Sequence, residues 1–539
     1  MRAQQRLYFA DMSASPADHP QNAENYNHLG NSLQTAGRLA EAVDAYARAL
    51  SLRPDFFEAM ANLGVVLSKL ERVDESIDVL NRAIRLRPGS AEAHAELAGA
   101  FRRKEQSSQA IACLRRALEL RPDFPSALNQ LGQLLLEQRS IDEAVAAFRR
   151  LVALQSNKPQ PYNNLGNALA AQGKMDEALQ QFHKALALQP DNTEVLGSLA
   201  NALARLRRFD EAERAYRRGL EVAPQSAELR WNLGLMQLLL GDYPQGWQNY
   251  EARWQLKTRF FYRKFNVPLW NGSDLAGKRV VLHAEQGFGD AIQFVRYAPM
   301  VAARGARVVL QCQPELQRLF RSIQEVDQVI NDEQEAPAVD LHCPLMTLPM
   351  RFGTTVQSIP SRVPYLWADA NEIRKWRDRL SGFDGTLKVG ISWTGDPKNA
   401  NNRDRSVGLE ALSPLLQMPG ASFFSLQKQL PKPGPAQIPG GIRCNDWTAE
   451  LQDFADTAAL VSQLDLVITI DSAVAHLAGA LGKPVWVLLS YAGDWRYLLD
   501  REDSPWYPTM RLFRQIYSGQ WKAPIERAGD ELKRLANLP

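Results

Sequence analysis

Residues 466–484 read LVITIDSAVAHLAGALGKP, and this stretch decides the fold class of the second half of the chain. Its first five residues are uninterrupted apolar or β-branched residues, as in a parallel strand that is buried on both faces. An alanine-rich segment of helical length follows, and Gly482 and Pro484 end it before a second apolar run. A strand, a helix and another strand in succession predict a parallel α/β unit.

Short apolar runs of the same kind recur on both sides of this unit, with helix-length segments between them. They occupy residues 279–283, 306–312, 387–393, 422–426 and 484–489. We therefore expect two doubly wound, Rossmann-like lobes. Their expected bounds are 271–370 and 371–539, with a connection within 358–384 and a closing helix over 525–536.

The first half of the chain repeats with a period of 34 residues, which resembles the tetratricopeptide (TPR) pattern of paired helices. A Leu-Gly or Leu-Ala pair appears in seven registers, and a large residue stands 16 positions after its second member, as Tyr46 does after Gly30. The small residue would let the second helix approach, and the large one would fill the gap. The pattern predicts an α-solenoid at 23–260, after a tail at 1–22.

Amides often stand just before the Leu-Gly or Leu-Ala pair, on helices that would line the concave groove of the solenoid. In protein O-GlcNAc transferases, TPR asparagines hold the substrate backbone, and the row here resembles that arrangement. An amide both donates to and accepts from a peptide unit of any sequence. The alternative is a set of solvated polar positions on amphipathic helices. The candidate groove residues are Asn62, Gln130, Asn164 and Asn232.

Composition places the chain among ordinary globular proteins, with 45% apolar and 23% charged residues. The net charge of +3 gives no reason to expect nucleic acid as a partner. No apolar run reaches the roughly 20 residues that span a bilayer, and none near the start resembles a signal peptide. The four cysteines form no CxxC pair, so we expect reduced thiols in a cytoplasmic protein.

A glycine-rich turn, AEQGFGD at 284–290, follows the first strand of the first lobe. Gly287 and Gly289 would let a ligand approach the backbone. Ile292 stands where a dinucleotide fingerprint needs its third glycine, which disfavours a nicotinamide or flavin enzyme. Asp290 has two interpretations: it caps a helix that begins near residue 291, or it is a general base at the mouth of a cleft.

The turn after the strand 466–470 offers a second set of polar groups. Ser472 is expected to cap the next helix, whose free N–H groups would hold a pyrophosphate. Asp471, at the carboxyl end of the strand, would accept hydrogen bonds from sugar hydroxyls. His476 lies one helical turn after Ser472 and faces the same side, although a packed histidine is the simpler interpretation.

Together the two turns resemble the heptosyltransferase-type glycosyltransferases of family 9. The resemblance covers about residues 271–515 and rests on Gly-x-Gly-Asp in the first lobe and on Asp-Ser-x-x-x-His-Leu-x-x-Ala-Leu-Gly-x-Pro in the second. It implies the GT-B fold, in which two Rossmann-like lobes flank the active site. It also implies that Asp290 is the general base on the acceptor. The donor-sugar and phosphate turn would comprise Asp471, Ser472, Ala473 and His476.

Family 9 enzymes also carry a basic residue after the first strand of the second lobe, facing the phosphates. The candidates here are Lys398, Arg403 and Arg405, which are otherwise the charges of a solvated loop. Gln427 follows the strand 422–426 at an expected nucleotide-side position, where the family often has an acid for the ribose. The identity of the nucleotide therefore stays open.

The resemblance implies inverting transfer of a sugar from a nucleotide sugar to a hydroxyl. No Asp-x-Asp motif is present, so we expect no metal and no cofactor. A peptide-binding solenoid favours Ser or Thr of a protein as the acceptor, and flagellin is one candidate, because some TPR-fused transferases act on it. Two alternatives stay open: a non-catalytic scaffold, and a transferase acting on lipopolysaccharide or another glycan. Self-association through the TPRs is a further option.

Overall fold

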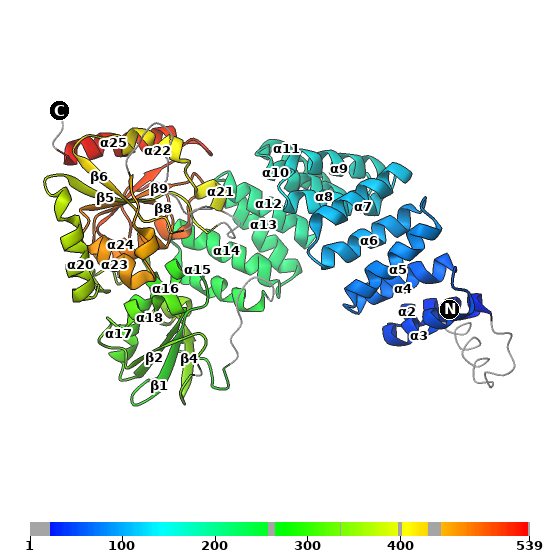
Figure 1. Ribbon diagram of the computed structural model, residues 1–539, viewed down its shortest axis with the longest axis horizontal. Coiled ribbons are helices and arrows are strands. Elements are labelled where there is room, and N and C mark those ends of the chain that lie inside the picture. The colour runs from blue at the N-terminus through cyan, green and yellow to red at the C-terminus, as the bar shows by residue number, and fades with distance from the viewer. Residues whose placement is uncertain (1–21, 257–264, 335, 397–401, 429–443, 537–539) are drawn as a thin grey trace. The chain divides into compact units, whose positions relative to one another are not determined.

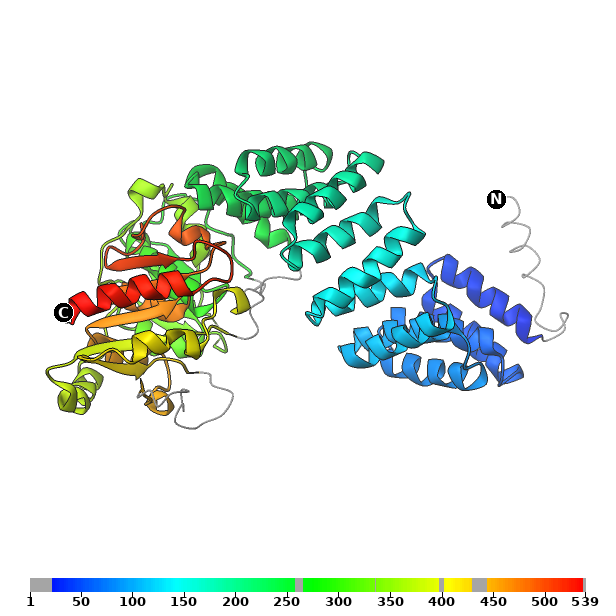
Figure 2. The same cartoon turned by 90° about the horizontal axis from the view of Figure 1, so that it is seen from above.

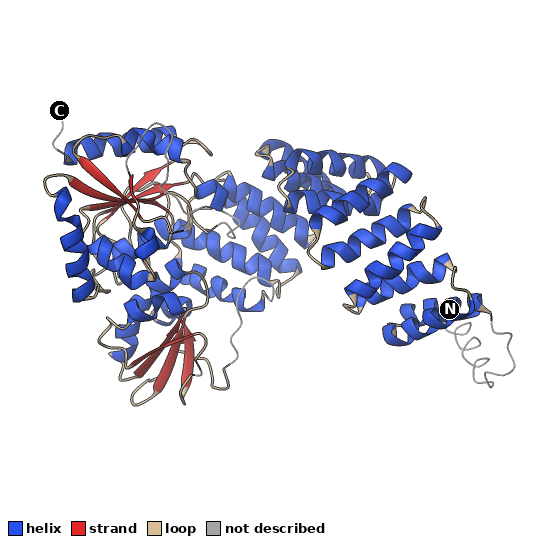
Figure 3. Ribbon diagram, viewed as in Figure 1, coloured by secondary structure: helices blue, strands red, loops and turns tan. Residues whose placement is uncertain are grey.

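The computed structural model describes residues 22–256, 265–334, 336–396, 402–428 and 444–536 (Figure 1). The chain divides into two compact units, Met1–Val222 and Ala223–Pro539. The first is helical, and the second contains the described strands (Figure 3).

Antiparallel helix pairs make up the described part of the first unit, and consecutive pairs stack on one another (Figure 2). This is the TPR solenoid that the 34-residue period predicts. Its helices are α2 Ala23–Thr35, α3 Leu39–Leu52, α4 Phe57–Lys69, α5 Val73–Leu86, α6 Ala91–Arg103, α7 Ser107–Leu120, α8 Pro125–Glu137, α9 Ile141–Leu154, α10 Pro159–Ala171, α11 Met175–Leu188, α12 Thr193–Arg205 and α13 Phe209–Val222.

The repeated glycine and the large residue 16 positions later touch within each pair, as the spacing predicts. A Cβ atom added at Gly166 would lie 2.5 Å from Cε1 of Phe182. The same relation holds for Gly132 and Cζ of Phe148, at 2.5 Å. In these two pairs only hydrogen at the small position leaves room for the ring, so the contact sets how closely the two helices approach.

Left-handed backbone closes the turn between the two helices of most pairs, at positions 34 residues apart. Glycine takes this conformation at Gly37 and Gly173, with φ of 78° and 86°. Charged residues take it at the equivalent positions of other pairs, with φ near 60°: Glu71, Glu105, Arg139 and Arg207. A side chain at such an angle meets the following carbonyl group, so these turns carry local strain.

A seventh helix pair opens the second unit, since the division falls at Val222. It consists of α14 Ala227–Leu240 and α15 Tyr243–Tyr250, with a 3₁₀ helix at Glu251–Gln255. Trp247 of α15 is 2% exposed and packs edge-on against Trp495 and Phe294 of the α/β part, with ring centroids 5.3 and 6.3 Å apart. The last register of the repeat is thereby part of the α/β core.

The first sheet has four parallel strands in the order β3-β2-β1-β4. Its strands are β1 Arg279–His283, β2 Arg307–Cys312, β3 Gln328–Asn331 and β4 Leu341–Pro344, and its helices include α16 Phe288–Phe294, α17 Ala298–Ala302 and α18 Pro314–Phe320. The apolar runs predict β1 and β2. The other two strands, β3 and β4, are short and only partly buried, and no continuous apolar run predicts them.

The second sheet has six parallel strands in the order β10-β9-β8-β5-β6-β7. Its strands are β5 Leu387–Ser392, β6 Ala421–Ser425, β7 Cys444–Asn445, β8 Leu466–Ile470, β9 Val485–Leu489 and β10 Met510–Arg514. One apolar core lies under α20 Ala370–Leu380, α23 Phe454–Ser462 and α24 Ala473–Ala480, and the opposite core lies under α22 Leu409–Leu416 and α25 Lys522–Leu535. Helices thus cover both faces, as in a doubly wound, Rossmann-like lobe.

Candidate functional site

The first corner of the site is the turn between β1 and α16. This helix begins at Phe288, three residues earlier than expected, and Gly287 stands at its cap position. Asp290 is therefore the third residue of the helix rather than its cap. Its Oδ2 accepts a hydrogen bond of 3.1 Å from the backbone N–H of Gly287, which fixes one oxygen of the carboxylate.

This corner lies directly against the corresponding helix of the second sheet, α24 (Figure 1). A Cβ at Gly289 would lie 2.8 Å from Cδ2 of His476 and 3.5 Å from Cα of Ala473. Glycine is needed here for the close approach of two helices, as well as for any approach of a ligand. The two turns singled out in the sequence, whose residues Asp290 and Asp471 are 181 positions apart, are neighbours in one unit.

A third loop, which follows β9, joins the two corners. Arg496 donates from Nη2 to Oδ1 of Asp290, from Nη1 to Oδ1 of Asp494 at 2.8 Å, and from Nε to Oε1 of Gln293 at 2.8 Å. The Arg496 side chain is 10% exposed and that of Asp290 is 20% exposed. Burial raises the pKa of Asp290 above its ordinary value, while the charge of Arg496 opposes this shift. A carboxylate with a raised pKa is a stronger base.

Asp471, at the second corner, is held by the same loop. Its Oδ1 accepts from the hydroxyl of Tyr497 at 2.9 Å, and its Oδ2 lies 4.0 Å from Nη1 of Arg405. Burial raises the pKa of Asp471 to about 6, with the nearby charge of Asp494 acting in the same direction. The site therefore brings together three acids, Asp290, Asp471 and Asp494, and two arginines, Arg405 and Arg496.

Ser472 stands at the cap position of α24, as expected, but its side chain makes no capping hydrogen bond. Its hydroxyl lies 3.1 Å from Oγ1 of Thr469 instead. The residues from Asp471 to Val474 are half-buried. The start of this helix thus keeps backbone N–H groups near the surface, a common setting for an anion.

His476 belongs to α24 and is buried against Gly289 of α16. Its Nδ1 lies 3.0 Å from the hydroxyl of Tyr507, and burial lowers the pKa of His476 well below its ordinary value. A neutral imidazole that packs two helices together accounts for this placement. A contact with a donor sugar stays a prediction.

Arg405 and Gln427 lie on the loops after β5 and β6. Arg405 ends a short helix, α21 Asn402–Arg405, and its Nη2 occupies space 2.6 Å from a Cβ added at Gly395. Oε1 of Gln427 accepts from three groups of the β5 turn: the hydroxyl of Ser392 at 3.2 Å and the N–H groups of Trp393 and Thr394 at 3.2 and 3.0 Å. Gln427 thus shapes the turn that carries the basic loop.

Of the three basic residues predicted to face the phosphates, two have side chains outside the described part of the structure. Lys398 lies outside the described residues, and Arg403 belongs to α21, with a side chain outside the described part. Both stay predictions for phosphate binding.

The predicted groove amides lie on the first helices of their pairs, and two of them, Asn62 and Asn164, donate to amides of the preceding pair. Nδ2 of Asn62 donates to Oδ1 of Asn27 at 3.1 Å and to Oδ1 of Asn31 at 3.0 Å, and Nδ2 of Asn164 donates to Oδ1 of Asn129 at 2.6 Å. These side chains form rungs between successive pairs. Gln130 donates to Ser126 at 3.2 Å, and Asn232 lies half-buried on α14 of the second unit.

Asp494, Arg496 and Tyr497 were not among the residues predicted from the sequence. A signal was available, because these residues follow the apolar run 484–489, and the carboxyl ends of parallel strands meet at one edge of a sheet. No recognisable motif marks the loop itself. Within the described ranges, no group of three or more His, Cys, Asp or Glu side chains has the geometry to hold a metal ion. No helix in the part of the chain that the structure covers is long and apolar enough for a membrane crossing.

Family models match the repeat region and part of the α/β region. Tetratricopeptide repeat families match residues 28–91, 96–160 and 169–239. Glycosyltransferase family 9 (heptosyltransferase) matches residues 442–492, a segment that contains β8, α24 and β9.

Among characterised proteins, the chain is similar to Protein FlbA of Caulobacter vibrioides (strain ATCC 19089 / CIP 103742 / CB 15). The two are 28% identical over 323 residues, which are 56% of this chain and 54% of that protein. The chain thus spans about half the length of this relative.

Solved structures similar to the chain are repeat proteins. YrrB, described as a TPR protein with an unusual peptide-binding site, is 26% identical over 33% of this chain and 91% of its own, with a TM-score of 0.29. MamA is 26% identical over 32% of this chain and 94% of its own, with a TM-score of 0.29.

Proposed function

We propose that this chain, which joins tetratricopeptide repeats in its N-terminal region to a family 9 glycosyltransferase domain at its C-terminus, transfers a sugar from a nucleotide sugar to a hydroxyl group. The two sheets would act as the lobes of a GT-B pair. The first lobe, at about 271–370, would hold the acceptor. The second, at about 371–539, would hold the donor.

The observation that supports this proposal most is the meeting of the two corners. Asp290 stands on the helix that follows β1, and the start of α24 lies beside that helix. A base from one sheet and an anion-binding helix start from the other are the two components that transfer from a sugar diphosphate requires.

In the proposed step, Asp290 accepts the proton of the acceptor hydroxyl as the hydroxyl oxygen attacks the anomeric carbon. The bond between that carbon and the phosphate oxygen breaks, and its electron pair leaves with the nucleotide. Attack opposite to the leaving group inverts the anomeric configuration. The raised pKa of Asp290, caused by burial, makes it a better proton acceptor than an exposed aspartate.

The donor side would use groups around the second corner. Arg405, together with Lys398 or Arg403, would offset the charge of the leaving phosphates, so that no metal is required. The N–H groups of Ala473 and its neighbours at the start of α24 would bind a phosphate oxygen. Asp471 would accept hydrogen bonds from the sugar, and Gln427 would face the nucleotide.

The acceptor would be a Ser or Thr of a protein that the TPRs recognise, with flagellin as one candidate. TPRs support protein–protein interaction, and the row of amides on the first helices, of which Asn62 is half-buried, would offer both donors and acceptors to a peptide. The same reaction on a soluble partner fits a cytoplasmic enzyme that has no membrane-spanning helix among those described.

The test is donor turnover with a panel of nucleotide sugars, comparing the full chain with Asp290→Asn. We expect transfer or slow donor hydrolysis to fall about 100-fold or more in the variant, because asparagine cannot accept the proton. Asp530→Asn is the matched control, since Asp530 lies exposed on α25 far from the site in sequence. Equal turnover in both variants would remove Asp290 as the base.

Two alternatives predict different outcomes. A non-catalytic scaffold would turn over no donor but would still bind a partner through the TPRs. A glycan-directed transferase would keep transfer to glycan after removal of the first unit, whereas the protein-acceptor proposal requires that transfer to protein is lost while donor binding remains.

A further inference from the structure

The 3₁₀ helix that follows the seventh helix pair carries a buried arginine at a repeat position that is small in most other registers. Its side chain, that of Arg253, is 0% exposed. A fully buried arginine is rare and costly unless its charge and its N–H groups are all matched, so helix packing alone does not explain it. The residues at the same position of the six earlier registers are buried too: Ala49, Ala83, Ala117, Leu151, Ala185 and Gly219.

All three nitrogens of the Arg253 guanidinium group have partners. Nε and Nη2 donate to the carboxylate of Glu285 at 3.3 and 3.0 Å, and Nη2 also donates to the hydroxyl of Thr347 at 2.9 Å. Nη1 donates to Glu251 and to the backbone carbonyl of Tyr250. The Glu285 side chain is 3% exposed, so this ion pair is shielded from water. A planar guanidinium group that meets one carboxylate through two nitrogens fixes its orientation as well as its distance.

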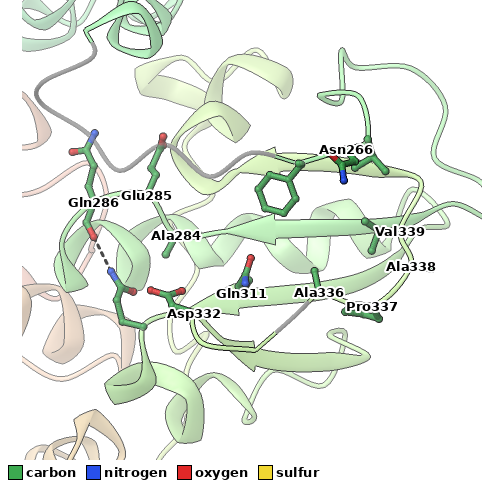
Figure 4. Close-up of a pocket in the computed structure, with 13 residues that line it drawn as sticks. Asn266, Ala284, Glu285, Gln286, Gln311, Asp332, Ala336, Pro337, Ala338 and Val339 are labelled. Carbon is green, nitrogen blue, oxygen red and sulfur yellow. Dashed lines mark hydrogen bonds between the residues drawn. The ribbon is translucent and has the colours of Figure 1, made fainter. Parts of the chain in front are cut away.

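Glu285 belongs to the turn that leads to the proposed base. It stands five positions before Asp290 and two before Gly287, whose N–H donates to the Asp290 carboxylate. The next residue, Gln286, makes a second link to the helix pair, because its Nε2 donates to the hydroxyl of Tyr250 at 3.1 Å. Figure 4 shows Glu285 and Gln286 side by side in this turn. The helix pair and its 3₁₀ helix therefore hold two consecutive residues of the turn.

The same helix pair also contacts the loop that supplies the partner of Asp290. Trp247 of α15 packs edge-on against Trp495, and the guanidinium carbon of Arg496 lies 4.3 Å from the centroid of the Trp495 ring. Helix α14 packs against the 3₁₀ helix Trp495–Tyr497. The seventh pair thus supports the ion pair from both ends, through the turn before Asp290 and through the tryptophan beside Arg496.

Docking of the helix pair onto the α/β part does not by itself require this buried ion pair. Tyr243, Trp247 and Tyr250 are each at most 3% exposed and already provide an apolar contact surface. Replacement of a buried ion pair by apolar side chains of similar volume is often neutral or stabilising. The ion pair of Arg253 and Glu285 adds direction to the contact, which apolar packing supplies less well.

We propose that the seventh helix pair is a working part of the transfer site, and that Arg253 is a positioning residue that holds the turn of Asp290 through Glu285. Its effect on turnover rests on the proposed function, whereas its hold on the turn does not. A base that is displaced from the acceptor hydroxyl slows the chemical step in the bound complex. Donor binding is assigned to the other lobe, so kcat should fall while the KM for the donor stays the same.

The experiment compares the full chain with Arg253→Met and with the double variant Arg253→Met/Glu285→Met. The single change leaves the buried carboxylate of Glu285 without its cation, whereas the double change removes both charges and should restore much of the lost stability. The probe is the UDP, GDP, dTDP or ADP sugar that the parent turns over fastest. In the double variant we expect kcat to stay about 10-fold to 100-fold below that of the parent, with the donor KM within about threefold. A return of kcat to the parent value together with stability would show that Arg253 is only structural, and would overturn the proposal.

Leu532→Ala is the control for lost stability. Leu532 is 0% exposed and belongs to the apolar core under α25, on the opposite face of the second sheet from the core that contains the Asp290 helix. Its truncation leaves a cavity and destabilises the chain without touching the turn. Below its unfolding midpoint this variant should keep the kcat and KM of the parent. If its kcat falls as far as that of the double variant, the loss reflects stability alone and the proposal is wrong.

Hydrogen exchange of the backbone amides at 284–290 tests the same inference without any substrate. We expect these amides to exchange at least tenfold faster in the double variant than in the parent, and at the parent rate in Leu532→Ala. Faster exchange in a chain whose parent turns over no donor would reject the transferase and leave the hold on the turn standing. Unchanged exchange and unchanged kcat, with an active parent, would reject the role of Arg253 and leave the transferase standing.

Discussion

Arg496 and Asp290 lie 206 positions apart in the sequence and form an ion pair that links the loop after β9 to the helix after β1. Both side chains are mostly buried, so each charge has lost much of its hydration. Either charge without the other would be costly in this setting. The pair therefore orients the proposed base and also ties the second sheet to the first.

Replacing Arg496 by methionine should lower both stability and activity. Methionine keeps much of the side-chain volume but leaves Asp290 and Asp494 without their cation, at a cost of about 3 kcal/mol. The unpaired Asp290 should also rise further in pKa, so the acid limb of the rate profile should move to higher pH. Urea unfolding and the pH dependence of donor turnover measure the two effects.

A double-mutant cycle separates positioning from general damage. Asp290→Asn in the Arg496→Met background should cost less than the sum of the two single changes, because the interaction is already lost. Additive effects would show that the ion pair contributes nothing to the site.

Stability should depend on pH through Asp471. Its pKa is raised to about 6 from an ordinary value of 3.8, first of all by burial, so the fold favours its protonated form. This contribution is complete below about pH 3.8 and is lost as pH rises to about 6. Asp471→Asn cannot ionise. Its free energy of unfolding, relative to that of the parent, should therefore increase between pH 4 and pH 6, by an amount on the order of 2 kcal/mol.

Tyr497→Phe supplies the control for this titration. The Tyr497 hydroxyl donates to Asp471 and lowers the pKa of Asp471, so its removal should move the same transition to higher pH. Urea unfolding at intervals of half a pH unit follows both variants. A parent and an Asp471→Asn variant that keep a constant difference across this range would contradict the assignment.

The parts of the fold that were predicted are those that a sequence repeat or a continuous apolar run marks. The period of 34 residues predicted the solenoid, and continuous apolar runs predicted the central strands such as β8, because both signals are complete within a few residues. Strands β3 and β7 were not predicted, because they are short edge strands with few apolar side chains to bury.

Fewer of the contacts in the candidate site could be predicted from the sequence. Asp290 and Ser472 stand in recognisable turns, but the sequence does not state that Gly289 lies against His476. The role of Arg496 depends on its ion pair with Asp290. An ion pair between residues of two sheets cannot be predicted from the sequence around either residue.

The strained turns of the solenoid predict a stabilising substitution. Glu105 has φ of 60°, a conformation that costs a residue with a side chain about 1–2 kcal/mol. Glu105→Gly should stabilise the chain by about 0.5–1 kcal/mol, after the larger loss of backbone entropy for glycine is subtracted. Gly173→Ala, at the equivalent position with φ of 86°, should destabilise it by about 1 kcal/mol. Thermal unfolding of both variants checks the sign, and a loss of stability in Glu105→Gly would show that its side chain contributes more than the strain costs.

The contact between Gly289 and His476 predicts opposite outcomes for two neighbouring glycines. A methyl group at Gly289 would lie 2.8 Å from the His476 ring, whereas one at Gly287 would meet only Oδ2 of Asp290, at 3.5 Å. Gly289→Ala should therefore push α16 away from α24, lower the free energy of unfolding by about 1–3 kcal/mol and reduce transfer, while Gly287→Ala should be nearly neutral in stability. Adding His476→Ala to Gly289→Ala should restore much of the lost stability, because it removes the ring that the methyl group strikes. If the double variant is as unstable as the sum of its parts, the two helices are held together by something other than this contact.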